Sequence, residues 1–180
     1  MTKNKILIYG MGNPGRGDDG LGPEFISSLE SAKFSGLTLE ANYQLQVEDA
    51  LLFSEHELVI VVDALKAGSR PFTFKKIKPS RNYSFSTHTL SPEVVVYLSQ
   101  TLYQRKPEGY VLGIRGYDFQ IGEGLSLKAR ENLRTALSFC VNFLKEVISE
   151  NKFSGIMNNL KTTEVSKRSY GKRNKRTPGT

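Results

Sequence analysis

The chain has 180 residues, of which 38% are apolar, a length and composition that suit one globular domain followed by a tail. Its only cysteine, Cys140, excludes an internal disulfide and a zinc site built from cysteines, and no apolar run is long enough for a signal peptide or a membrane span. The net charge is +7, but the segment 161–180 holds seven basic residues and one acidic residue, so the remainder of the chain is almost neutral. We therefore expect a cytoplasmic protein that contacts neither nucleic acid nor membrane.

Apolar runs of strand length alternate along the first half of the chain with segments of helical periodicity. The five consecutive apolar residues at 58–62 are typical of a buried central strand. Phe25, Ile26 and Leu29 have the spacing of one helix face. In chain order, this half predicts strand 5–10, a glycine-rich loop, helix 22–34, strand 37–46, short helix 47–56 and strand 57–65.

The second half continues the alternation. Ser91 and Pro92 suit the N-cap and the first position of a helix. Cys140 lies on the apolar face of the longest periodic segment, so we interpret it as a core residue. In chain order, this half predicts edge strand 72–78, helix 91–104, strand 109–116 and helix 124–150.

Strands that alternate with helices predict an α/β fold. We expect a single domain over residues 1–155, with a mainly parallel twisted sheet of about five strands and helices on both faces. The strand at 72–78 is the candidate for an antiparallel edge strand. Residues 156–180 are basic and polar, and we interpret them as a disordered tail.

Several side chains that can bind a metal follow the predicted strands. Asp18 and Asp19 come after the first strand, Asp63 ends the third, and His88 precedes the helix at 91–104. Ligand sites of open α/β sheets lie beyond the carboxyl ends of the strands, so these groups are expected near one edge. Carboxylates with one imidazole suit a divalent ion such as nickel or zinc. Taken singly, each residue could instead be a helix cap, a turn residue or a surface histidine, and His56 is expected to be a solvated loop residue.

The glycine-rich loop also matches a nucleotide-binding pattern, since Gly10, Gly12 and Gly15 have the Gly-x-Gly-x-x-Gly spacing. The following helix is predicted to begin only after Asp19, and two carboxylates would lie where a pyrophosphate needs backbone N–H groups. We therefore interpret the match as coincidental and keep a nucleotide-binding module as an alternative.

Four stretches, "ILIYGMGNPGRGDDGLG", "VIVVDAL", "STHTLSPEVVVYL" and "VLGIRGYDFQIGEGLS", resemble in this order the hydrogenase maturation proteases, over about residues 5–150. The resemblance implies an endopeptidase that removes a C-terminal extension from the large-subunit precursor of a [NiFe]-hydrogenase after nickel insertion. It implies that Asp19, Asp63 and His88 bind nickel and that Asp19 and Asp63 are the catalytic candidates. The nickel belongs to the substrate and is not a permanent cofactor. We expect a monomer, with Asp18 and Asn13 shaping the loop.

One departure from the family concerns the second strand, which many members follow with a glycine-rich "DGGT"-like turn. Here the stretch is "EANYQLQVEDA", so the class of hydrogenase that is recognised stays open. The sequence also leaves open whether the metal polarises a carbonyl or activates a water, or whether an aspartate acts instead as general base. The alternatives are a related α/β peptidase that processes another precursor without nickel and a non-catalytic binder of the precursor.

Overall fold

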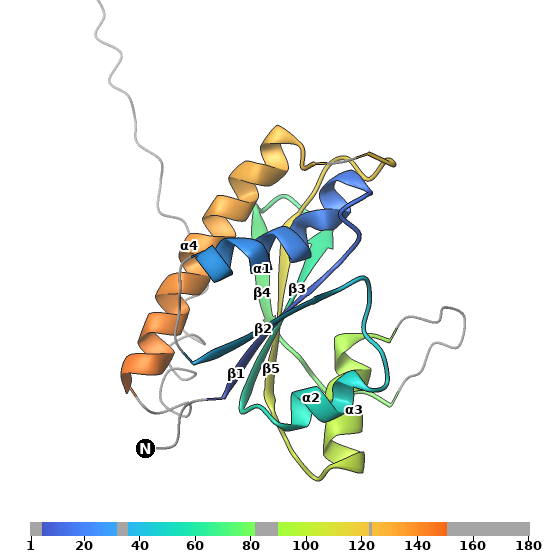
Figure 1. Ribbon diagram of the computed structural model, residues 1–180, viewed down its shortest axis with the longest axis vertical. Helices are drawn as coiled ribbons and strands as arrows, with labels where there is room; N and C mark the ends of the chain where they lie inside the picture. The colour runs from blue at the N-terminus through green and yellow to red at the C-terminus, as the bar shows by residue number, and fades with distance from the viewer. Residues whose placement is uncertain (1–4, 32–35, 82–89, 123, 151–180) are drawn as a thin grey trace, which may run out of the picture. The chain divides into compact units, whose positions relative to one another are not determined.

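A computed structural model describes residues 5–31, 36–81, 90–122 and 124–150. It contains a five-stranded sheet in the order β2-β1-β3-β5-β4, with helices on both faces (Figure 1). The predicted boundary between domain and tail at 155/156 lies outside the described residues. The chain forms two compact units. Met1–Phe143 contains the sheet, and of Leu144–Thr180 the structure describes only the end of the last helix. The elements are β1 (Ile6–Met11), a 3₁₀ turn η1 (Gly17–Gly20), α1 (Leu21–Ser31), β2 (Leu37–Asn42), α2 (Asp49–Ser54), β3 (Leu58–Leu65), β4 (Phe72–Lys76), α3 (Pro92–Leu102), β5 (Glu108–Arg115) and α4 (Leu127–Glu150).

Four of the strands are parallel, and β4 pairs antiparallel with β5 at the edge of the sheet. The predicted α/β class, the mainly parallel five-stranded sheet and the antiparallel edge strand are thus confirmed. The central position of β3 follows from its sequence, because the residues at 58–62 are buried on both faces of the sheet.

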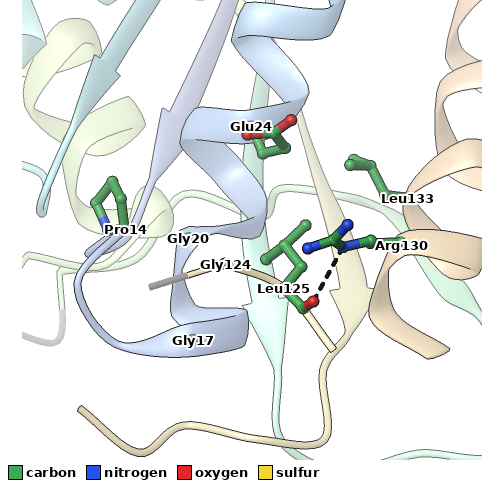
Figure 2. Close-up of a pocket in the computed structure, with 8 residues that line it drawn as sticks. All are labelled: Pro14, Gly17, Gly20, Glu24, Gly124, Leu125, Arg130 and Leu133. Atoms are coloured by element: carbon green, nitrogen blue, oxygen red, sulfur yellow. Dashed lines mark hydrogen bonds between the residues drawn. The ribbon is translucent and has the colours of Figure 1, made fainter. Parts of the chain in front are cut away.

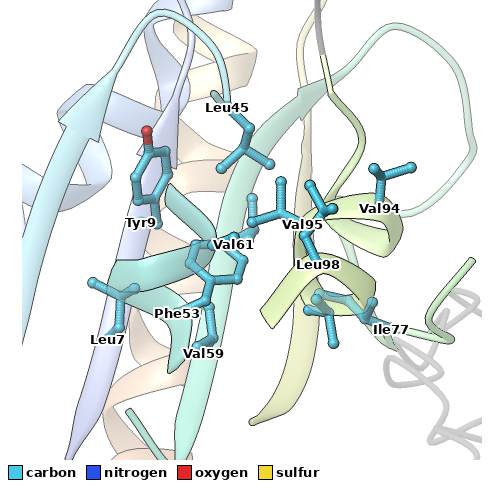
Figure 3. Packing of buried hydrophobic residues seen from close by; sticks show 12 residues of the cluster. Leu7, Tyr9, Leu45, Phe53, Val59, Val61, Ile77, Val94, Val95 and Leu98 are labelled. Carbon is cyan, nitrogen blue, oxygen red and sulfur yellow. The ribbon is translucent and has the colours of Figure 1, made fainter. Parts of the chain in front are cut away.

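Alternate side chains of the strands build two separate cores. On one face, Tyr9 and Val61 pack against α2 and α3 with Phe53 and Val95, as Figure 3 shows. On the other face, α1 packs against β1 and β3, and aromatic rings of α4 contact those of β4, with Phe139 lying 5.0 Å from Phe72 and Phe143 lying 5.2 Å from Phe74. The helices therefore hold the sheet from both sides and leave the ends of its strands for other functions.

Several predicted elements are longer in the sequence pattern than in the structure, and two of them show the reason. The strand at 37–46 ends at Asn42, because Leu45 leaves the sheet, pairs with Leu90 and is fully buried in the core. The helix at 124–150 begins only at Leu127, because Gly124 has a φ of +85° and the preceding segment is hydrogen-bonded elsewhere. Long-range contacts thus decide both boundaries.

Two local predictions have clear outcomes. Ser91 and Pro92 occupy the predicted N-cap and first positions of α3, although the Ser91 hydroxyl makes no capping bond and its carbonyl accepts the N–H groups instead. Cys140 is a core residue as predicted, since it is 1% exposed and burial raises the pKa of its thiol to about 12. Among the described residues, no helix is long and apolar enough to cross a membrane.

Candidate active site at the carboxyl edge of the sheet

Asp19 and Asp63 come together where β1 and β3 end. These two strands are neighbours with Gly10 opposite Val62, so the turn after β1 lies beside the last residues of β3. Asp19 belongs to the η1 turn that follows β1, and Asp63 belongs to β3 itself. The charge of Asp19 acts on the carboxyl of Asp63, which places the two groups within electrostatic reach of each other.

The Asp63 carboxyl is the most strongly perturbed acid of the site. Its pKa is raised to about 6: burial is the largest cause, the negative charge of Asp19 also raises the pKa, and a 2.8 Å hydrogen bond from the backbone N–H of Ala64 partly lowers it. A carboxyl with this pKa exchanges a proton near neutral pH, and a nearby cation would favour its ionised form.

The Asp19 carboxylate is half-buried and is held by its own loop. Its Oδ2 accepts the backbone N–H of Asn13 at 3.0 Å, and the side chain of Asn13 accepts the N–H of Gly15 at 2.9 Å. Asn13 therefore shapes the loop as predicted. Over the described ranges of the chain, Oδ1 of Asp19 has no hydrogen-bond partner and is available to a ligand.

The adjacent Asp18 has a different role, because it is fully buried. Oδ2 accepts the N–H of Tyr117 at 2.6 Å, the N–H of Asp118 at 2.9 Å and the hydroxyl of Ser126 at 2.8 Å, and Oδ1 accepts the N–H of Ser126 at 2.7 Å. Burial alone would raise the pKa of Asp18, but these hydrogen bonds outweigh it and hold the pKa below its ordinary value. Asp18 anchors the β5–α4 connection, residues 116–126, and only Asp19 faces the site.

The backbone of the glycine-rich loop is not a phosphate cradle. The N–H groups of Gly12, Asn13 and residues 15–19 all donate to protein oxygens. Gly10 and Gly12 serve close packing, because a Cβ on Gly10 would lie 2.4 Å from the carbonyl oxygen of Gly22 and a Cβ on Gly12 would lie 1.8 Å from that of Asp19. The structure thus argues against the nucleotide-binding alternative.

The remaining predicted histidine ligand, His88, lies outside the described residues. Within the described part of the chain, no three His, Cys, Asp or Glu side chains form a group that could hold a metal ion. His56 lies in the loop between α2 and β3 as expected, but its ring is only partly solvated, because it is half-buried and bridges the Leu52 carbonyl and the Thr38 hydroxyl at 2.8 Å each. His56 fastens α2 to β2, which sequence alone does not reveal because the partners come from different elements.

One side chain of the edge was missed by the sequence analysis. Arg115, the last residue of β5, lies opposite Leu65 and on the same sheet face as Asp63. Its Nε and Nη1 are buried and have no hydrogen-bond partner in the part of the chain that the structure describes, while its guanidinium lies 5.3 Å from the Tyr117 ring. Unpaired buried donors are rare, so this group is suited to an acceptor from a ligand. Its position at the carboxyl end of a predicted parallel strand was the available signal.

A pocket of about 270 Å³ lies between the glycine-rich loop, α1 and the start of α4 (Figure 2). Arg130 crosses it, and its Nε donates to the Leu125 carbonyl at 3.0 Å. Neither Asp19 nor Asp63 lines it, so it is distinct from the carboxylate pair. It is lined by Pro14, Gly17, Gly20, Glu24, Gly124, Leu125, Arg130 and Leu133.

This fold recurs in solved structures of one class of peptidase. HybD, a hydrogenase maturating endopeptidase of E. coli, matches with a TM-score of 0.65 and 17% identity over 79% of this chain and 93% of its own. HycI, a [NiFe] hydrogenase maturation protease of Thermococcus kodakarensis, matches with a TM-score of 0.63 and 23% identity over 80% of this chain and 94% of its own. The chain therefore has the fold of the hydrogenase maturation endopeptidases.

Sequence similarity identifies the family itself. A curated protein of Methanocaldococcus jannaschii, whose name proposes it as a hydrogenase maturation protease, is 30% identical over 164 residues, covering 81% of this chain and 100% of the relative. No protein-family model matches the sequence. The chain therefore belongs to the hydrogenase maturation protease family, which is a family of peptidases.

Proposed function

We propose that the protein is an endopeptidase that removes a C-terminal extension from the large-subunit precursor of a [NiFe]-hydrogenase after nickel insertion. The observation that supports this most directly is the pair Asp19 and Asp63 at the carboxyl edge of the sheet, in a chain that belongs to this family. The pair offers carboxylate oxygens as ligands, and the pKa of the Asp63 carboxyl is raised. Perturbed carboxyl groups of this kind are typical of functional sites.

The nickel in this proposal is cargo that the precursor brings to the site. Asp19 and Asp63 would bind it through carboxylate oxygens, and His88 would supply an imidazole nitrogen. Three protein ligands leave coordination positions for sulfur and other atoms of the substrate, which suits a borderline ion such as nickel. Holding the metal would also fix the nearby peptide bond in the site, which lowers the entropic barrier to its hydrolysis.

Two chemical routes use the same pair of carboxylates. In one, nickel polarises the scissile carbonyl or a bound water. In the other, an aspartate accepts the proton of the attacking water, for which the raised pKa of Asp63 is suitable. In both routes, loss of either carboxylate removes the activity.

The proposal is tested by incubating the purified full-length protein with nickel-loaded and nickel-free precursor and measuring release of the C-terminal peptide. We expect release only with nickel, and none with Asp19→Asn or Asp63→Asn. Equal cleavage without nickel would instead identify a nickel-independent peptidase. Binding of the loaded precursor without cleavage would identify a non-catalytic binder.

A further inference from the structure

Large apolar side chains are exposed on the β5–α4 connection and at the start of α4. Tyr117 is 48% exposed, Ile121 is 91% exposed and Leu127 is 81% exposed. We call these three residues the apolar patch. A single exposed apolar residue is common on protein surfaces, but several on one short segment indicate an interaction site.

The segment that bears the patch is fixed to the glycine-rich loop. Asp18 holds its two ends through the N–H groups of Tyr117 and Ser126. Between them, Gly17 N–H donates to the Gly122 carbonyl at 2.8 Å and Gly122 N–H donates to the Gly15 carbonyl at 3.0 Å. The apolar patch is therefore preorganised on a segment fixed to the loop that carries Asp19, and a partner that binds it orders little further chain.

Three cationic side chains lie on or beside the segment that bears the apolar patch, which also carries the exposed Asp118. The ammonium of Lys128 lies 5.6 Å from the Tyr117 ring, and that of Lys66 lies 5.2 Å from the ring of Phe119, the neighbour of Asp118. Arg16, which pairs with Gly122, is also exposed. A partner that matches this surface presents apolar side chains bordered by carboxylates.

We propose that the apolar patch docks the hydrogenase precursor on an apolar surface with an acidic border, which rests on the function proposed above. The segment 161–180 of the same chain is an unfavourable occupant, because its seven basic residues would meet the basic border. A second copy is also unfavourable, since a two-fold contact would bring this border against itself. The precursor is the occupant that also brings its scissile bond to Asp19 and Asp63.

The test compares two substitutions of exposed helix-terminal leucines. Leu127→Glu changes the first residue of α4, where a carboxylate favours the helix, so the protein should fold normally. Leu102→Glu changes the last residue of α3, which is 58% exposed and lies toward the opposite edge of the sheet, and serves as the matched control. With nickel-loaded precursor, we expect Leu127→Glu to raise KM at least about tenfold and to change kcat less than about twofold, while Leu102→Glu changes neither. Ile121→Glu should behave as Leu127→Glu does.

Three results separate the possible failures. Equal KM values for Leu127→Glu, Leu102→Glu and the unchanged protein would overturn the docking surface and leave the proposed function standing. A change in oligomeric state by light scattering, with unchanged KM, would overturn it in favour of a contact between copies. Absence of cleavage by the unchanged protein would overturn the proposed function, and the docking proposal with it.

Discussion

At the scale of single residues, Asp18 and Asp19 show how adjacent identical side chains divide two tasks. Asp18→Asn replaces one acceptor oxygen with an NH₂ group, so at least one buried N–H donor loses its partner. We expect a loss of about 3 kcal/mol in the free energy of unfolding, measured by urea denaturation at pH 7. Asp19→Asn is the control, because Asp19 accepts a single hydrogen bond and its substitution should cost less than about 1 kcal/mol. Equal losses for the two variants would contradict the anchoring role of Asp18.

The pKa of Asp63 is shifted in the opposite direction to that of Asp18, and this shift makes the stability depend on pH. Its pKa is about 6 in the folded protein and 3.8 in the reference state, so between these values the folded state binds more protons and stability falls as the pH rises. In the metal-free protein at pH 7, Asp63→Asn should therefore raise the free energy of unfolding by up to about 3 kcal/mol. The gain should disappear below about pH 4, where the carboxyl is neutral in both states. Urea titrations across this pH range measure this gain. A variant less stable than the unchanged protein at pH 7 would show that burial of the ionised Asp63 carboxylate does not destabilise the fold.

Arg115 offers a third residue-scale prediction. Because its Nε and Nη1 are buried without a partner in the described part of the chain, replacing it with methionine removes a desolvation penalty and keeps the apolar stem. We expect Arg115→Met to leave the free energy of unfolding unchanged within about 1 kcal/mol or to raise it, since only the contact with the Tyr117 ring is lost. Thermal unfolding measures this, and a loss above about 2 kcal/mol would show that the guanidinium has a stabilising partner.

At the scale of elements, the start of α4 is coupled to the glycine-rich loop through Ser126. Its hydroxyl donates to Asp18 and accepts the N–H of Ala129 at 3.3 Å, as an N-cap residue does. Ser126→Ala should cost about 1–2 kcal/mol and speed hydrogen exchange in the first turn of α4. Because Ser126 and Asp18 share one network, the double variant with Asp18→Asn should lose less than the sum of the single losses. Strict additivity would mean that the two groups act independently.

The sequence predicts elements better than their boundaries. Apolar periodicity locates β3 and α4, because burial on both faces or along one stripe determines which residue types are tolerated. It does not locate the end of β2 or the start of α4, where Leu45 and Ser126 make contacts to distant segments. In the edge site, too, some features are predictable from the sequence and others depend on distant contacts. The convergence of Asp19 and Asp63 is predictable because neighbouring parallel strands end together, whereas the anchoring role of Asp18 depends on partners about a hundred residues away.

At the scale of the whole molecule, charge and fold are located in different parts of the chain. The segment 161–180 holds most of the net charge, while the described core, the carboxylate pair and the apolar patch all precede residue 151. Ending the chain after residue 155 should therefore leave the free energy of unfolding unchanged within about 1 kcal/mol. At 0.5 M salt, KM for the nickel-loaded precursor should also be unchanged, because surface charges are screened.

At low ionic strength, the same truncation should raise KM modestly. An acidic partner is attracted by the net charge of the chain, and this attraction speeds association at a distance without any fixed contact. The truncated and full-length proteins are compared by cleavage kinetics at two salt concentrations, with urea denaturation as the control for folding. A loss of stability on truncation would show that residues 156–180 pack on the domain, and a KM difference that persists in high salt would show a specific contact between these residues and the precursor.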